Sequence, residues 1–192
     1  MLPELIQHCA PQVAPATMTA IVHVESGGNP LAMWNNATKS LVIPANRQQA
    51  VAYLRRAMAA GQKVDVGIAQ VDTENFAAYG LTPATAFDAC TNLRVGAQIL
   101  TAAYRQAVAT FGSGQTALYH AFEAYNSGRL WGDSIYAKRI LAASGHPFPK
   151  GYGSSFPLSG AGPAYKALTV QWTPNTAKQR ARPARLAFVV QW

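Results

Sequence analysis

One acidic residue in this sequence, Glu25, has a position that favours general acid catalysis. Glu25 closes a segment in which Met18, Ile21 and Val22 recur at three- and four-residue steps, and this spacing predicts a helix over residues 16–25. A carboxyl group on or beside such an apolar face has a raised pKa, because burial disfavours its charged form. A group that keeps its proton near neutral pH can protonate the leaving oxygen of a glycosidic bond. The alternative is a solvated charge at a helix end.

Other reaction chemistries have little support. The four histidines are scattered, and no CxxC pair occurs, so we expect no metal site. No GxSxG nucleophile motif and no GxxxxGK phosphate loop is present, and we expect no cofactor. His23 lies two residues before Glu25, which on a helix turns it to a different face, so we interpret it as structural.

The remaining elements are mostly helical. Apolar spacing and stop signals predict further helices over residues 46–60, 82–89, 92–110, 115–125 and 133–143. Residues 65–72 alternate polar and apolar side chains and predict a short strand or an extended loop. Residues 31–45 show no period, and we expect a loop there. Gly96 and Ala97 in the apolar stripe of the 92–110 helix would permit close helix contact.

Charge divides the chain into two parts. Up to Asp133, eight Lys and Arg balance eight Asp and Glu, whereas the residues beyond it carry eight more Lys and Arg and no acid. Pro and Gly become dense after Gly145, which indicates a linker. We therefore expect a folded domain over 1–145 and a basic tail over 146–192, which either meets an anionic partner or only aids solubility. Its apolar end, LAFVVQW, could dock on a partner or on the domain.

Three separated segments share one family resemblance. Residues 25–30 (ESGGNP) resemble the ES-x-x-NP motif of soluble-lytic-type transglycosylases, residues 67–70 (GIAQ) resemble their GLMQ motif, and residues 124–128 (AYNSG) resemble their AYNAG motif. Their order is that of the family. Residues 76–100 are similar to the VirB-type branch, which opens the cell wall for type IV secretion and conjugation. The resemblance covers about residues 3–143 and leaves out the tail.

The resemblance implies a mainly α, lysozyme-like fold (α+β, similar to goose-type lysozyme) with a cleft for peptidoglycan glycan strands. Glu25 would protonate the oxygen between N-acetylmuramic acid and N-acetylglucosamine, and then help the sugar's own 6-hydroxyl to close a 1,6-anhydro ring. Ser26, Gln70, Tyr125 and Asn126 would line the cleft. Tyr125 would also hydrogen-bond Glu25. Ordinary core packing is the alternative role for Tyr125, and the two roles are compatible.

The sequence departs from the family pattern at a few positions, of which Ser127 in place of the Ala of AYNAG is a mild one. Ala69 replaces the usual Met of GLMQ, and Asp72 stands where many relatives have Asn. Asp65 precedes the GIAQ segment, where some lysozyme-like members carry a second catalytic carboxylate. If Asp65 faces Glu25, a hydrolytic lysozyme-type reaction becomes possible; we expect capping or turn formation for it instead. A third alternative is a weakly active wall-binding assembly factor whose tail recruits a secretion-channel protein.

The two cysteines, Cys9 and Cys90, could be a disulfide or two buried thiols, and spacing alone leaves both open. In the VirB-type branch the paired cysteines suggest a bridge. The resemblance implies the periplasm, although the first fifteen residues do not read as a signal peptide. No apolar run reaches bilayer-spanning length, so we expect no integral membrane protein. The tail shows no nucleic-acid-binding motif, and we expect no nucleic-acid partner.

Overall fold

The computed structural model describes residues 1–145 of the 192-residue chain, so the predicted linker and tail lie outside the described residues. Helices alternate with four very short strands. In chain order the elements are α1 (Leu2–Cys9), α2 (Pro15–Ser26), β1 (Met33–Asn35), β2 (Ser40–Val42), α3 (Arg47–Ala59), β3 (Val64–Val66), β4 (Val71–Asp72), the 3-10 turn η1 (Thr73–Asn75), α4 (Phe76–Tyr79), α5 (Ala89–Phe111), α6 (Gln115–Ser127) and α7 (Ser134–Ser144).

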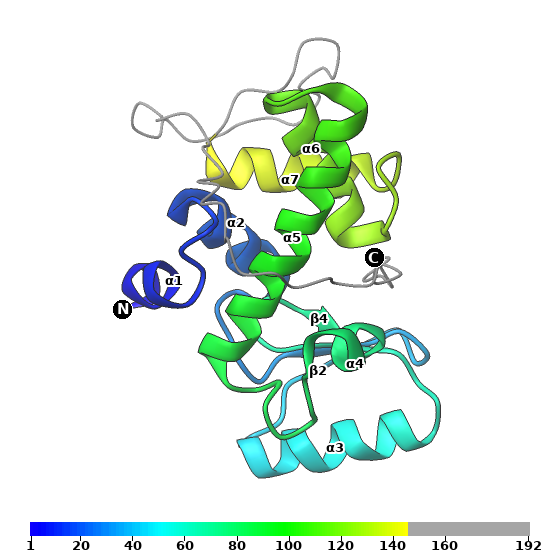
Figure 1. Cartoon of the computed structure of the whole chain (residues 1–192). Coiled ribbons are helices and arrows are strands. Elements are labelled where there is room, and N and C mark those ends of the chain that lie inside the picture. Colours follow the sequence, from blue (N-terminus) through cyan, green and yellow to red (C-terminus); the bar gives the residue numbers. More distant parts are fainter. Residues whose placement is uncertain (146–192) are drawn as a thin grey trace.

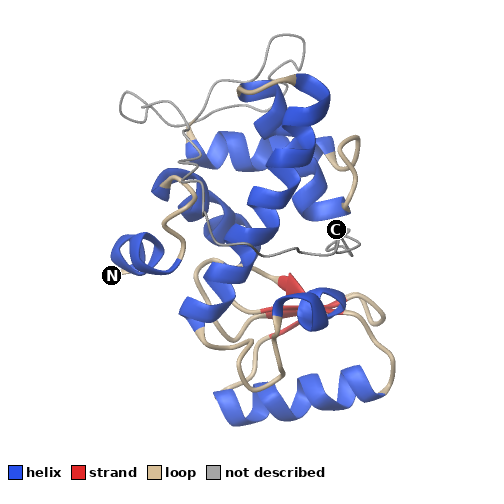
Figure 2. Cartoon of the chain, in the orientation of Figure 1, coloured by secondary structure: helices blue, strands red, loops and turns tan. Residues whose placement is uncertain are grey.

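The long helix α5 connects two regions of the molecule. Helices α6 and α7 gather at one end, the sheet with α3 lies at the other, and α5 runs between them (Figure 1). Helix α5 packs against α6 and α1, while α7 packs against both α2 and α6. The strands are confined to the end that also holds α3 and α4 (Figure 2). The predicted mainly helical class with a minor β component is confirmed.

The strands form one antiparallel sheet in the order β2-β1-β3-β4. Strand β1 pairs with both β2 and β3, so Trp34 is the partner of Leu41 on one side and of Asp65 on the other. The prediction of a plain loop over 31–45 was therefore wrong. Strands of three residues are too short to show alternation in the sequence, and their pairing with residues some thirty positions away stabilises them instead.

The segment between α4 and α5 also differs from expectation. Residues 82–89 do not form the predicted helix: the hydroxyls of Thr82 and Thr85 bind each other's backbone N–H groups and close a turn. Helix α5 then begins at Ala89, where the Asp88 side chain accepts the Thr91 N–H at 2.8 Å. The helices predicted over 16–25, 46–60, 92–110, 115–125 and 133–143 are confirmed within a few residues at each end.

Gly96 allows α5 to approach its neighbours closely. A Cβ atom built at this position would lie 2.8 Å from the Cβ of Ala69 and 3.0 Å from the hydroxyl of Tyr125. The prediction of a small-residue contact on this helix is thereby confirmed. The contact brings the GIAQ turn of residues 67–70 against α5, beside α6.

A disulfide joins the N-terminal helix to α5. Cys9 ends α1 and Cys90 lies in the first turn of α5; their sulfurs are bonded, with the Cα atoms 5.1 Å apart.

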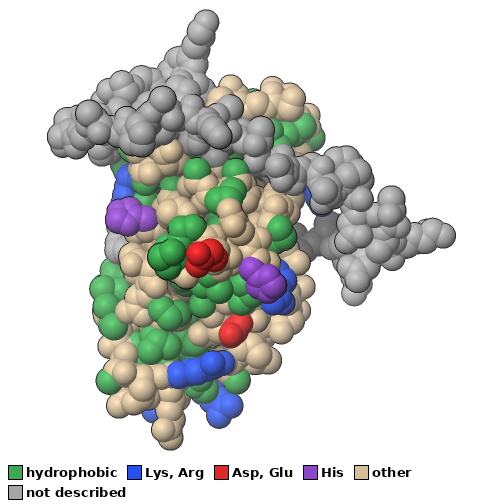
Figure 3. All heavy atoms as spheres, turned by 90° about the vertical axis from the view of Figure 1, so that its left-hand side faces the viewer, with side chains coloured by type: hydrophobic (Ala, Val, Ile, Leu, Met, Phe, Trp, Pro, Cys, Tyr) green, Lys and Arg blue, Asp and Glu red, His purple; other side chains and the backbone are tan. Residues whose placement is uncertain are grey.

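On the face that carries α1, acidic, basic and histidine side chains form separate small groups among apolar and neutral surface (Figure 3). Within residues 1–145, no helix is both long and apolar enough to traverse a bilayer.

Candidate active site

Glu25 occupies the last turn of α2, where the helix meets the rest of the domain. Gly27 adopts a left-handed conformation (φ 61°) and ends the helix, with its N–H bonded to the carbonyl of His23. The Glu25 side chain packs into the domain, and the residue is only 7% exposed. The alternative of a solvated charge at a helix end is thus wrong.

Helix α7 supplies the groups that face the Glu25 carboxyl. The hydroxyl of Tyr136 donates a hydrogen bond of 2.5 Å to Glu25 Oε1. Burial raises the pKa of Glu25 from 4.5 to about 7, although the Tyr136 hydrogen bond and the positive charge of Arg139 each lower it. Desolvation therefore dominates. The result is a carboxyl group that is still partly protonated at neutral pH, which suits a general acid.

The predicted hydrogen bond from Tyr125 to Glu25 is wrong. The Tyr125 hydroxyl instead donates to the backbone carbonyl of Ala69 at 2.7 Å. Its ring lies nearly parallel to that of Tyr136, with centroids 6.4 Å apart and an interplanar angle of 13°. Tyr125 therefore supports the tyrosine that contacts Glu25, and it ties α6 to the turn at residues 67–70.

Ser26 connects the end of α2 to the same turn. Its hydroxyl donates to the carbonyl of Ile68 at 2.7 Å and accepts the N–H of Gly28 at 3.1 Å. The first two family-like segments, far apart in the sequence, are thus joined directly beside the acid. In this structure the Ser26 hydroxyl is engaged with backbone.

Gln70 is directed inward and stabilises its own turn. It is 3% exposed and has a positive φ of 46°, and its amide donates to the carbonyls of Ala32 and Gly67 at 2.9 and 2.7 Å. Asn92 of α5 holds the turn from the other side: its Oδ1 accepts the N–H of Ala69, and its amide donates to Val66 and Ala86 carbonyls. Asn92 could not be identified from the sequence, since no local pattern marks it.

Asn126 contacts the start of α7. Its amide donates to Asp133 Oδ2 at 3.1 Å, while Asp133 Oδ1 accepts the backbone N–H groups of Ile135 and Tyr136. Asp133 is therefore both the cap of α7 and the link between that helix and the AYNSG segment. The Oδ1 atom of Asn126 is buried without a hydrogen-bond partner, so it remains able to accept one.

Asp65 lies in the middle of β3, fully buried, and not at a cap or turn as we had expected. Its Oδ2 accepts the side-chain amide of Asn36 at 2.9 Å. Burial, followed by the charge of Asp72 and then that of Glu25, raises the Asp65 pKa well above its usual value. Asp65 is thus electrostatically coupled to Glu25 but has no exposed surface.

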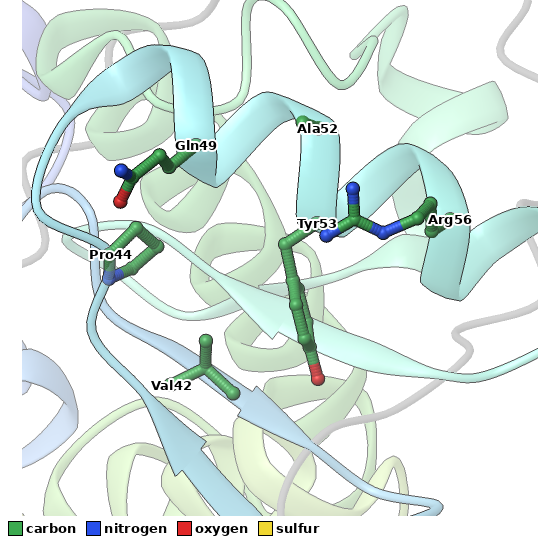
Figure 4. A pocket seen from close by; sticks show the side chains of 6 residues that line it. All are labelled: Val42, Pro44, Gln49, Ala52, Tyr53 and Arg56. Carbon is green, nitrogen blue, oxygen red and sulfur yellow. The ribbon is translucent and has the colours of Figure 1, made fainter.

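A separate pocket of about 340 Å³ lies between β2 and α3. Val42, Pro44, Gln49, Ala52, Tyr53 and Arg56 line it (Figure 4). None of the predicted site residues is among them. This hollow therefore belongs to the outer side of the sheet region, apart from the Glu25 neighbourhood.

Comparison with known proteins identifies the family to which this site belongs. The sequence model of the Transglycosylase SLT domain matches residues 5–133. The chain belongs to this family. The Type IV secretion system protein virB1 of Brucella suis biovar 1 (strain 1330) is 42% identical over 154 residues, and this match covers 75% of the present chain and 65% of the relative. Protein virB1 of Agrobacterium fabrum is 38% identical over 122 residues, covering 64% and 49%.

The chain thus spans no more than about two thirds of the length of these virB1 relatives. No solved structure matches it. Glu25 and the three family-like segments all fall inside the residues matched by the SLT transglycosylase model, whereas Tyr136 lies just beyond them. The predicted recognition of an SLT transglycosylase related to virB1 is confirmed. Tyr136 and Asp133 were overlooked as site residues because their roles arise from tertiary contacts.

Proposed function

We propose that this SLT-family chain is a peptidoglycan lytic transglycosylase that cleaves the β-1,4 bond between N-acetylmuramic acid and N-acetylglucosamine and forms 1,6-anhydro-muramic acid. The observation that carries the proposal is the Glu25 carboxyl, which is buried, bonded to Tyr136 and has a pKa of about 7. Near neutral pH such a group exists in both forms, so it can act as acid and as base in one cycle.

The reaction would proceed in two proton transfers at the same carboxyl group. Glu25 first gives its proton to the leaving glucosamine oxygen, while the muramoyl acetamido group assists at the anomeric carbon. The carboxylate then removes the proton of the muramoyl 6-hydroxyl, which attacks the anomeric carbon and closes the anhydro ring. Tyr136 keeps the carboxyl oriented through both steps, since burial raises its own pKa well above 10 and leaves it a donor.

The lysozyme-type alternative would need Asp65 as a second, charged carboxylate next to the sugar. Its electrostatic coupling to Glu25 favours this reading, but its complete burial and raised pKa oppose it. We therefore place anhydro formation first. Ser26, Gln70, Tyr125 and Asn126 remain proposed substrate-side residues.

The decisive experiment is mass analysis of the muropeptides released from purified peptidoglycan. Anhydro ends and hydrated ends differ by one water, so the products identify the reaction directly. Glu25→Gln should abolish release while leaving the fold intact, and Asp65→Asn should retain anhydro products. Turnover by the Glu25 variant would refute the assignment, and exclusively hydrated ends from the unaltered chain would support the hydrolase.

We further propose that the enzyme acts in the cell envelope and opens the wall for a type IV secretion or conjugation apparatus. The likeness to virB1 proteins supports this role. The domain over 1–145 would cut glycan, and the residues from 146 on would engage a channel protein. Deleting residues 150–192 distinguishes the enzyme from the recruiting factor. If the deletion abolishes secretion but leaves lytic activity intact, the tail acts in recruitment. If secretion is lost only in the Glu25 variant, the chain acts as an enzyme.

A further inference from the structure

Two buried carboxyl groups lie side by side in the sheet. Asp65 on β3 and Asp72 on β4 are direct register partners across an antiparallel pair. Side chains at such positions project from the same face of the sheet, with Cβ atoms about 5 Å apart. Both residues have no solvent exposure. Two full negative charges in this position would repel each other without screening by water.

The hydrogen bonds of the pair leave one oxygen on each residue unpaired. Asp65 Oδ2 accepts the Asn36 amide, and Asp72 Oδ1 accepts the Glu74 N–H at 2.7 Å and the Thr73 hydroxyl at 3.3 Å. Asp65 Oδ1 and Asp72 Oδ2 are buried with no partner. Buried polar atoms are almost always hydrogen-bonded, so a donor is missing here. One proton placed between these two oxygens would satisfy both and remove the repulsion.

We propose that Asp65 and Asp72 share a single proton, held on Asp65 Oδ1 and donated to Asp72 Oδ2, so that Asp72 keeps Asp65 uncharged next to Glu25. This inference rests on the proposed function, and it makes Asp72 a positioning residue for the site. It also explains why Asp65 does not serve as a lysozyme-type carboxylate in this chain.

The surroundings decide which member carries the proton. Asp72 accepts the Glu74 backbone N–H and the Thr73 hydroxyl, and both bonds favour its charged form, whereas the charge of Glu74 opposes that form more than the charge of Lys63 supports it. Asp65 receives one amide, and the charge of Glu25 disfavours ionisation there more than Lys39 favours it. The charge therefore rests on Asp72 and the proton on Asp65. Burial raises the pKa of Asp72 only to about 6, which agrees with this order.

A proton is a better occupant than a metal ion. Within residues 1–145 no cluster of three or more His, Cys, Asp or Glu is placed to hold a metal. Two carboxylates alone provide a poor set of ligands for a hard cation, which normally takes six or more oxygens.

The test is a pH titration of the full chain labelled with ¹³C at the aspartate carboxyl carbons, followed by NMR. In the unaltered chain one of the two signals should be protonated at pH 7, and Asp65→Asn and Asp72→Asn assign it. In Asp72→Asn the titration midpoint of Asp65 should fall by about one pH unit or more, because the neighbouring charge is lost. In Asp65→Asn the midpoint of Asp72 should not fall, because Asp65 is already uncharged when Asp72 titrates. Asp88→Asn, at a remote helix cap, should move neither.

Glycan cleavage gives a second readout. In Asp72→Asn the lower midpoint lets Asp65, the member coupled to Glu25, ionise at a lower pH. That charge disfavours ionisation of Glu25, so the alkaline limb of the pH profile should shift to higher pH. An unmoved limb overturns the proposal. Three results of the titration would also overturn it: both aspartates ionised at pH 7, an unchanged Asp65 midpoint in Asp72→Asn, or aspartate signals that change when EDTA is added. Because the titration needs no substrate, it stands even if Glu25→Gln proves active and the proposed function fails.

Discussion

The hydroxyl of Tyr136 and the carboxyl of Glu25 are 111 positions apart in the sequence and 2.5 Å apart in the structure. Glu25 lies in the last turn of α2 and Tyr136 in the first turn of α7, and these two helices pack against each other. The contact depends on Asp133, which caps α7 and accepts the Tyr136 N–H. The acid is therefore held by a helix whose own start is fixed by a third residue.

Tyr136→Phe should lower glycan cleavage by roughly tenfold to a hundredfold, because the carboxyl loses its orienting donor. The hydroxyl also lowers the Glu25 pKa. Its removal should therefore raise that pKa and move the alkaline limb of the pH profile to higher pH. Measuring cleavage against pH tests both effects. Tyr53→Phe is the matched control, since the Tyr53 hydroxyl accepts a hydrogen bond from the Asn35 amide. In Tyr136→Phe, an alkaline limb that stays in place or moves to lower pH contradicts the prediction.

Glu25→Gln should stabilise the fold at alkaline pH. The folded chain holds the Glu25 proton up to about pH 7, whereas the unfolded chain loses it near 4.5. Between these values the folded state binds more protons, so its stability falls as pH rises. Glutamine escapes this loss and can still accept the Tyr136 hydrogen bond. The advantage of the variant should therefore grow by about 3 kcal/mol between pH 4 and pH 8 in urea unfolding. A difference that is flat with pH would argue against a buried acid.

Gly96→Ala should destabilise the domain by about 1–2 kcal/mol, despite the better helix propensity of alanine. The added methyl would collide with Ala69 and the Tyr125 hydroxyl, and neither can retreat because they are hydrogen-bonded to each other. Chemical denaturation measures the loss, and cleavage should also fall. Gln106→Ala, on the exposed side of the same helix, should change stability by less than about 0.5 kcal/mol. Equal effects of the two substitutions would contradict the close contact.

Reducing the Cys9–Cys90 bond should cost about 4 kcal/mol, since the bond closes a loop with a sequence separation of 81. Thermal unfolding with and without dithiothreitol measures this, and the Cys9→Ala/Cys90→Ala double variant should match the reduced protein. Thiol titration under denaturing, non-reducing conditions should find no free thiol. Two free thiols, or a melting temperature indifferent to reductant, would show that the bond is absent in solution.

Helices with marked apolar spacing could be predicted from the sequence, and so could Glu25 as the buried acid. Both follow from local patterns: residues 16–25 show their buried face directly, and the glycines after Glu25 mark the helix end. The strands around Trp34 and Asp65 could not be predicted, because three residues carry no readable period and their stability comes from cross-strand pairing.

The site residues divide in the same way. Motif position placed Tyr125 near the acid, but it could not show which tyrosine bonds Glu25. The tyrosine that bonds Glu25 is determined by how α7 packs onto α2. The sequence around Asp133 indicates only that a helix starts there, not that this cap positions Tyr136. Gln70 was expected to face substrate, yet its amide donates to the carbonyls of Ala32 and Gly67. Which way a polar side chain points is decided by unpaired backbone groups nearby, and these are known only from the fold.

The position of Glu25 in the final turn of α2 has one more consequence. The backbone carbonyls at that end of a helix point outward and carry roughly half a negative charge between them. A carboxylate there faces like charge along the helix axis, whereas a neutral carboxylic acid does not. The helix direction therefore acts together with desolvation to keep Glu25 protonated. At the opposite end of a helix, the same residue would be stabilised as the anion.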